Sequence, residues 1–151
     1  MTDVIDVKKK IREVLLADTA VSAVVDSRVY VGWIERNNIQ NLIPSITVFD
    51  PSEHGEVGML GGAQDEYNSI IQVDAWCKGD TKSGPLNRDE LAKAVKIALG
   101  KKANFAAMQA AGFVLGSPSV IALDEPEEEV KPPVYRKSLR FPVTYYSDSY
   151  V

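Results

Sequence analysis

Apolar residues recur at every second position over residues 67–78, "YNSIIQVDAWCK", and this period is typical of a half-buried β-strand. One side of the strand is mostly apolar and includes Val73 and Cys77. The other side is polar except for Ile70 and Trp76. Two large apolar side chains on a polar strand face need a cover. We expect either a neighbouring copy of the protein or this chain's own N-terminal segment or glycine-rich loop to provide it.

Apolar residues spaced by three and four positions predict helices. They do so over residues 3–17, 18–27, 87–100 and 103–111. Asp18 or Thr19 can cap the second of these helices. Asn87, with Glu90 three residues later, forms a variant of the capping box for the third. Gly100 stands where a glycine commonly follows the end of a helix.

Alternating patterns bounded by turn residues predict the other strands. These lie at residues 28–34, 45–50, 113–124 and 134–146. Pro142 cannot donate a backbone hydrogen bond, so the last strand should lie at a sheet edge or be bulged there. The order of elements indicates an α+β fold. We expect one domain over residues 1–151, with a single mixed, mainly antiparallel sheet of about four or five strands and helices packed on one face.

Residues 51–66, "PSEHGEVGMLGGAQDE", do not have the pattern of a core element. They contain four glycines, and Val57, Met59 and Leu60 give the segment an apolar tip. A long loop in a small domain is usually functional or disordered. We therefore predict a flexible arm that extends from the domain and reaches a neighbouring subunit or an adjoining protein.

The composition is that of an ordinary soluble domain. Of 151 residues, 45% are hydrophobic and 25% are charged, and the net charge is -4. Such a charge provides no basic surface for binding nucleic-acid phosphates without regard to sequence. No apolar run approaches the roughly 20 residues that a membrane span needs. Lysines at positions 8–10 interrupt the first apolar stretch, which excludes a signal peptide there. These features predict a protein made in a cytoplasm and kept there or in a particle assembled there.

The residues that carry chemistry do not form a recognisable constellation. His54 is the single histidine and lies in the glycine-rich arm, and no G-x-S-x-G motif is present. Cys77 is the single cysteine, which excludes an internal disulfide, and its strand position predicts a small buried apolar group. The acidic run at 124–129 lacks the spacing of a calcium loop and is better explained as a solvated turn. We expect no catalytic residue, no metal and no cofactor.

Charged side chains of opposite sign lie near each other in the C-terminal part of the sequence. Arg136, Lys137 and Arg140 form a basic patch a few residues after the acidic run. Patches of opposite sign on one small domain suit head-to-tail contact between identical subunits. We prefer this explanation to nucleic-acid binding because of the net negative charge.

The order of patterns along nearly the whole chain resembles the tail-completion family of long-tailed phages. The segments are "IREVLLADTAVSAVVDSRVYVG", "PSITVFD", "IQVDAWCKG", "DELAKAVKIAL", "GFVLGS" and "YRKSLRFPVTY". The most telling are the "QVDAW" strand with its following helix and the closing "YRKSLRF" strand. The resemblance is to the group containing tail-to-head joining proteins and lambda-type tail terminators. The arm at 51–66 and the helix at 103–111 look longer than the family's compact pattern.

This resemblance implies a structural virion protein with a mixed α/β subunit that forms a hexameric ring. Such a ring caps the tail tube, ends its polymerisation and meets the head connector, and DNA passes through it without sequence-specific binding. The implied partners are the tail tube protein and the head-connector or stopper protein, with assembly in the host cytoplasm and no membrane contact. We expect the subunit and partner contacts to involve Val57, Met59, Leu60, Ile70, Trp76, Arg136 and Arg140.

Two other functions remain open at this point. The first is a head-closure or adaptor subunit of the same phage neck, which also uses small ring-forming domains. The second belongs to another class: a small cytoplasmic hydrolase or ligand-binding domain, for which a deep pocket lined by convergent polar groups would be the sign.

Overall fold

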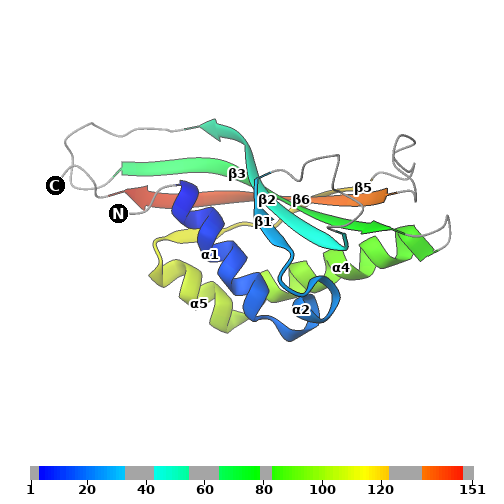
Figure 1. Ribbon diagram of the computed structural model, residues 1–151. Coiled ribbons are helices and arrows are strands. Elements are labelled where there is room, and N and C mark those ends of the chain that lie inside the picture. Colours follow the sequence, from blue (N-terminus) through cyan, green and yellow to red (C-terminus); the bar gives the residue numbers. More distant parts are fainter. Residues whose placement is uncertain (1–3, 33–42, 55–64, 79–82, 123–133, 148–151) are drawn as a thin grey trace.

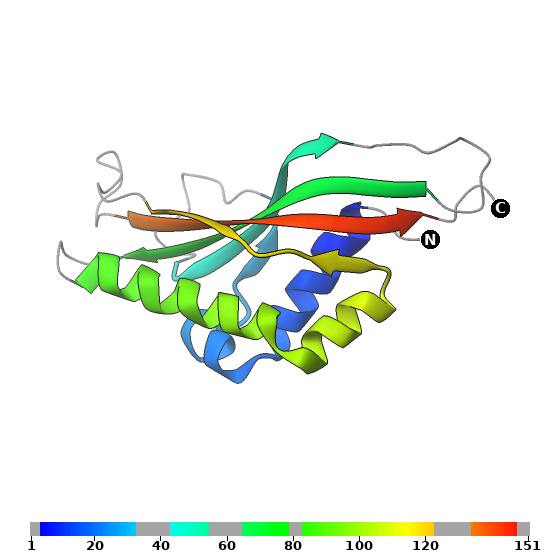
Figure 2. The same ribbon diagram turned by 180° about the vertical axis from the view of Figure 1, so that it is seen from behind.

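Helices cover one face of a mixed six-stranded sheet in the computed structural model of the protein (Figure 1). The structure describes residues 4–32, 43–54, 65–78, 83–122 and 134–147. In these residues all the helices lie on the same side of the sheet, as the view from behind also shows (Figure 2). This arrangement confirms the predicted α+β class and the single-faced helical layer.

The helices within the described residues are the four that the apolar spacing predicts. They are α1 (Val4–Ala17), α2 (Thr19–Val25), α4 (Ser83–Gly100) and α5 (Lys102–Ala110). Asp18 is the N-cap of α2, as one of the two predicted alternatives has it. The predicted start of α4 is wrong: the helix begins at Ser83, so Asn87 lies inside it and caps nothing. Gly100 is the last residue of that helix and does not follow it.

The sheet joins two long central strands to shorter outer ones. Its strands are β1 (Val29–Val31), β2 (Ser45–His54), β3 (Asp65–Lys78), β4 (Phe113–Leu115), β5 (Ser119–Ala122) and β6 (Val134–Ser147). They follow the order β1-β2-β3-β6-β4, and β5 also pairs with β6. β1 and β2 are parallel, and every other pair is antiparallel.

The strand predicted over residues 113–124 is interrupted, which raises the strand count above the predicted four or five. β4 pairs with residues 143–145 and β5 with residues 137–140, so the connection between them passes Pro142. The backbone N–H of Gly116 donates to the carbonyl oxygen of Pro142 over 2.8 Å. A side chain would not fit at Gly116, because a Cβ there would lie 2.8 Å from Cγ of Pro142.

Pro142 thus lies in a central strand, and the prediction that the last strand is at an edge is wrong. β6 has β3 on one side and β4 with β5 on the other. In a strand the nitrogen and the carbonyl oxygen of one residue point to the same neighbour. The carbonyl of Pro142 points to Gly116, so its missing N–H faces the break between β4 and β5. A proline is tolerated there because the neighbouring strand is interrupted.

Both strands that border the predicted arm are longer than expected. β2 continues past Pro51 to His54, with a register shift between Phe49 and Ser52, and β3 begins at Asp65. Residues 51–54 and 65–66 therefore belong to paired strands. The predicted tip, Val57, Met59 and Leu60, lies outside the described residues, as does the acidic run at 124–129.

The hydrophobic core fills the space between the sheet and the helices. Every second residue of β3 and β6 points toward the helices, and burial of each large apolar side chain among them stabilises the fold by about 1.5–3 kcal/mol. The core residues that are at most 3% exposed include Val7, Ile11, Ile71, Val73, Leu91, Val95, Leu139, Phe141 and Val143. The opposite, helix-free face of the sheet carries the residues that the sequence marks as unusual.

Candidate assembly surfaces

A network of polar side chains occupies the middle of the helix-free face. Gln72 donates through Nε2 to Oδ1 of Asp74 over 2.8 Å and to Oγ of Ser138 over 3.2 Å. Arg140 donates through Nε to Oε1 of Gln72 over 3.0 Å. The register places Gln72 opposite Arg140 and Asp74 opposite Ser138 on β3 and β6. The predicted basic residue Arg140 is therefore held in a defined position and is still exposed.

Trp76 lies at one end of this network and is buried by its own chain. It is 4% exposed and packs with Ile43 and Val134. Its indole N–H donates to Oγ1 of Thr47 over 3.0 Å, and the Arg136 guanidinium lies 5.1 Å from its ring centre. A cation over an indole ring is attracted to it. Of the two covers expected for Trp76, its own chain provides one, through Ile43 and Val134, which lie outside the N-terminal segment and the glycine-rich arm.

Burial raises the pKa of the Asp74 carboxyl, because desolvation disfavours its charged form. Hydrogen bonds with Ser138 and Gln72 act in the opposite direction but do not outweigh burial. Asp74 is fully buried; Nη1 of Arg136 lies 3.7 Å from its Oδ2, and that oxygen accepts no hydrogen bond. This carboxyl has no exposed surface through which to contact a substrate in this conformation.

Two of the predicted contact residues remain at the surface of this face. Ile70 is 36% exposed and lies opposite Pro142, while Arg140 is exposed two residue pairs further along. Lys137 belongs elsewhere, although the sequence groups it with Arg136 and Arg140. It points to the helical side, where its ammonium lies 3.1 Å from a carboxylate oxygen of Asp89. Alternation along a strand separates adjacent residues onto opposite faces.

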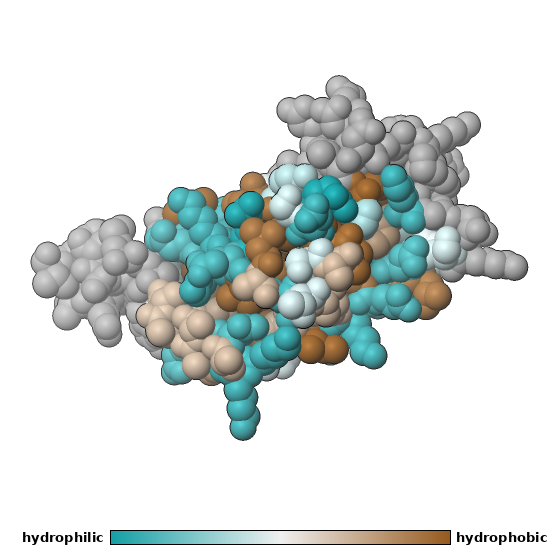
Figure 3. All heavy atoms as spheres, turned by 60° about the horizontal axis from the view of Figure 1, so that its bottom comes forward, coloured by the Kyte–Doolittle hydropathy of each residue, from teal (hydrophilic) through white to brown (hydrophobic). Residues whose placement is uncertain are grey.

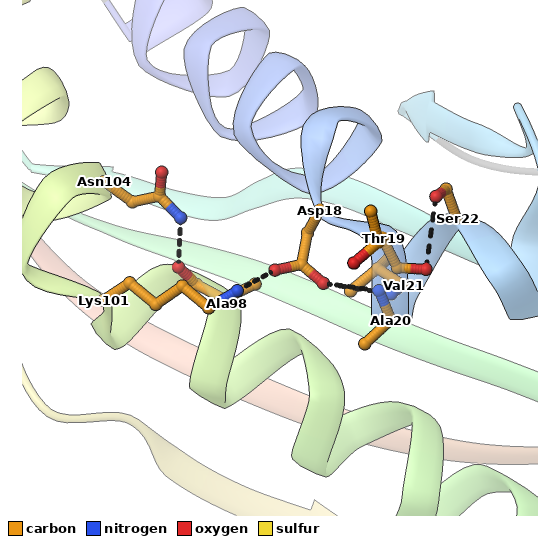
Figure 4. A network of polar contacts seen from close by, with 8 residues as sticks. All are labelled: Asp18, Thr19, Ala20, Val21, Ser22, Ala98, Lys101 and Asn104. Atoms are coloured by element: carbon orange, nitrogen blue, oxygen red, sulfur yellow. Dashed lines mark hydrogen bonds and ion pairs between the residues drawn. The ribbon is translucent and has the colours of Figure 1, made fainter.

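A second polar network joins three helices at one corner of the helical layer (Figure 4). Asp18 accepts the backbone N–H groups of Ala20 and Val21 at 3.0 and 3.1 Å, which caps α2. Its other oxygen lies 2.6 Å from the ammonium of Lys101, which precedes α5. Asn104 donates to the carbonyl oxygen of Ala98 over 2.7 Å and so closes the turn between α4 and α5. This corner is fixed by side chains from helices distant in sequence.

The same corner carries a set of lysines that sequence reasoning missed. Lys93, Lys96 and Lys101 line a shallow hollow together with Ile97 and Gly100. Positions three and four apart lie on one face of a helix. The signal is present in the sequence, in the run "KAVKIALGKK" at 93–102, but apolar spacing and capping residues predict the helix and not its charged side.

Cys77 is a small buried apolar group, as its strand position predicts. It is 2% exposed and forms no disulfide. Burial raises the pKa of its thiol to about 12, so the reactive thiolate is scarce at neutral pH. The hollow of about 400 Å³ beside it, between α2 and α4, is mostly apolar. Within the described ranges no three His, Cys, Asp or Glu side chains are grouped to hold a metal ion, and no helix there is long and apolar enough to cross a membrane.

Comparison with known proteins gives distant structural likenesses to solved chains. No protein-family model matches the chain, and no curated protein matches it either. Among solved structures it is similar to a chain of one described as "Virion of native gene transfer agent (GTA) particle". The two chains are 15% identical over 93% of this chain and 94% of the other, with a TM-score of 0.44. A likeness of this size identifies neither a family nor a function.

Proposed function

We propose that the protein is a structural subunit of a phage particle that forms a ring at the end of the tail. The ring caps the tail tube, ends its polymerisation and joins the tail to the head connector. The observation that carries this proposal is the pairing of β3 with β6. The two segments that most resemble the tail-completion family, "QVDAW" and "YRKSLRF", lie side by side at the centre of the sheet.

The surfaces of the subunit suit heterologous contacts, in which two different patches of one chain meet in neighbouring copies. Ile70 and Arg140 are exposed on the helix-free face, while Ile97 and Phe105 are exposed on the helical side. Val120 and Ile121 are 46% and 45% exposed on β5, at the sheet border. Scattered exposed apolar residues are ordinary in monomers. These exposed residues support the proposal because they lie on two opposite sides of the molecule.

In this proposal the subunit has no catalytic role and binds no cofactor. Six copies form the ring, which contacts the tail tube protein on one side and the head-connector or stopper protein on the other. The arm, with Val57, Met59 and Leu60, contacts a neighbouring subunit or one of these proteins. DNA passes through the ring without sequence-specific contact, which agrees with a net charge of -4.

Electron microscopy of the purified protein, with sedimentation analysis of the same sample, tests the ring. We expect closed rings and a mass of six subunits. A protein that remains monomeric at every concentration, and that also fails to close in the presence of tail tubes, would contradict the proposal.

The position of the protein in the particle separates the two neck roles. Immunogold labelling of isolated tails and of DNA-filled heads without tails should mark the tails if the protein is a tail terminator. Labelling confined to the heads would favour the head-closure or adaptor role. A phage lacking the protein should produce tails of uncontrolled length only in the first case.

A further inference from the structure

An apolar groove lies at the corner where α4 meets α5, beside the connection between β4 and β5. Two hollows, of about 560 and 250 Å³, share Lys96 and Gly100 as lining residues, and together they are called the groove below. Ile97 is 53% exposed and Phe105 is 40% exposed along it. Gly100 leaves space in the groove, since a Cβ there would meet no atom within 4 Å. Seen from the helical side, apolar side chains reach the surface among hydrophilic ones (Figure 3).

Among the described residues, the charged side chains that line this groove are all positive. They are Lys93, Lys96 and Lys101, and no described acidic residue lines it. Lys101 is engaged by Asp18, whereas Lys93 and Lys96 form no hydrogen bond or ion pair in the part of the chain that the structure describes. With Lys102, the ten residues 93–102 carry four lysines and no carboxylate. A ligand of this groove should therefore combine negative charge with apolar anchors.

The chain itself contains one segment of this chemistry. Residues 123–130, "LDEPEEEV", place five carboxylates between Leu123 and Val130. We propose that the groove between α4 and α5 binds this acidic segment of a second copy of the chain. The inference rests on the proposed ring and specifies the contact that links one subunit to the next.

The position of the segment favours a second copy over the same subunit. Ala122 pairs with Lys137, whose ammonium contacts Asp89 in the first half of α4. The groove instead lies along the second half of α4 and reaches Pro118. At about 3.3 Å per strand residue, Ala122, the last described residue before the segment, lies roughly 13 Å beyond Pro118. The segment of the same chain therefore starts at a distance from the groove, whereas we expect the segment of a neighbouring copy to fit along it.

A contact of this kind is heterologous, because the segment leaves one part of the subunit and the groove lies in another. Repetition of a heterologous contact produces a ring when the rotation closes. Charge attraction also orients the subunits during encounter, and the apolar residues provide the desolvated centre of the contact. The lysines and the apolar residues of the groove thus each have a role in the proposed assembly.

A peptide of residues 121–133 tests the groove directly. The receptor is the full-length protein carrying Asp124→Asn, Glu125→Gln, Glu127→Gln, Glu128→Gln and Glu129→Gln, so that its own segment no longer competes. Fluorescence anisotropy of the labelled peptide should show saturable binding that weakens as salt increases. Adding Lys93→Glu and Lys96→Glu to the receptor should weaken binding at least tenfold. The matched change Lys9→Glu and Lys10→Glu on α1 should leave binding unchanged. Binding that is absent, or that tolerates reversal of the groove charges, would overturn the proposal.

Substitutions of two different sizes at Gly100 provide a second pair of receptor variants. Gly100→Phe places a ring in the open part of the groove and should weaken peptide binding at least tenfold. Gly100→Ala adds one methyl group where no atom lies within 4 Å and should leave binding within twofold. Circular dichroism confirms that both variants are folded. Equal binding by the two variants would mean that the peptide lies elsewhere.

Mixing two defective subunits separates this contact from the ring itself. One subunit carries Lys93→Glu and Lys96→Glu and keeps its acidic segment; the other carries the five neutralised residues and keeps its groove. Each should be monomeric alone, and the mixture should form a one-to-one dimer, because only one complementary contact is possible. A mixture that stays monomeric would overturn the proposal and indicate that the segment binds its own subunit.

Rings formed by the lysine variant alone would overturn the proposal and leave the proposed function intact. If instead the peptide binds and the mixture dimerises while the wild-type protein never closes into rings, the contact stands and the proposed function fails.

Discussion

Asp18 shows how one side chain can connect helices that are far apart in sequence. Burial acts to raise the pKa of its carboxyl, but hydrogen bonds from Lys101 and from the backbone of Val21 and Ala20 outweigh it, so the pKa is lowered. A carboxyl whose folded-state pKa lies below the ordinary 3.8 stabilises the protein fully above that pH. The stabilisation is lost as the pH falls through the folded-state pKa. Lys101 is half exposed, so solvent screening reduces its share.

Asp18→Ala should lower the free energy of unfolding by about 1–2 kcal/mol at pH 7, because it removes the cap of α2. The difference from the wild type should narrow as the pH falls below 3.8. Urea unfolding at pH 7 and pH 3 measures both effects. Thr19→Ala is the matched control, since Thr19 is exposed and its side chain caps nothing. A loss of stability that is the same at both pH values would show that the charge of Asp18 is not involved.

Asp74 gives the opposite dependence on pH, because burial raises its pKa. Its charged form is disfavoured in the folded state, which lowers the stability of the protein. This loss of stability is absent below pH 3.8 and complete above the folded-state pKa. Asp74→Asn keeps an oxygen that can accept from Gln72 and should raise the free energy of unfolding at pH 7. The gain should disappear as the pH falls toward 3.8. A less stable variant at pH 7 would show that the pairing with Arg136 outweighs burial.

At the scale of whole elements, the interrupted border strand determines how β6 fits into the sheet. Gly116 and Pro142 meet where β4 ends and the chain turns toward β5. The break supplies a place for a residue that cannot donate, and the glycine lets the two backbones approach closely. These two residues together make a central position possible for a strand that contains proline.

Gly116→Ala should destabilise the fold by about 1–3 kcal/mol, because its Cβ would lie 2.8 Å from the proline ring. Gly100→Ala is the matched change and should stabilise the protein by up to about 1 kcal/mol, since that glycine is helical and its surroundings are open. Thermal unfolding of both variants gives the comparison. Similar shifts in the two variants would show that the close contact with Pro142 relaxes without cost.

At the scale of the whole molecule, the two unusual residues of β3 have different roles. Trp76 is covered within the subunit by Ile43, Val134 and Arg136, whereas Ile70 remains 36% exposed on the same face. A residue that is already buried in the free subunit stabilises the fold of that subunit. A residue exposed in the free subunit is available to a partner.

Trp76→Ala should therefore lower the free energy of unfolding of the subunit by about 3–5 kcal/mol. Ile70→Glu should change subunit stability by no more than about 0.5 kcal/mol. The same Ile70 variant should weaken self-association at least about tenfold, because a charge would be buried in the contact. Sedimentation velocity and urea unfolding separate the two effects. Unchanged association of the Ile70 variant would remove Ile70 from the interface.

The sequence by itself determined where the helices and strands occur along the chain, though not the ends or the number of the strands, because periods of 3.6 and 2 directly reflect which face is buried. It also determined that Cys77 is buried and that β3 carries two unusual residues. It did not determine the start of α4, because a helix end depends on local contacts as much as on capping residues.

Only the tertiary structure decided which residues meet across the sheet and between helices. The sequence could not place Trp76 inside the subunit, because its cover comes from Ile43 and Val134, far away in the chain. It could not place Pro142 in a central strand, because the break that permits this lies 26 residues earlier, at Gly116. Nor could it join Asp18 to Lys101, 83 residues apart. Periodicity reports burial along one element, whereas contacts between elements depend on the register and packing that folding produces.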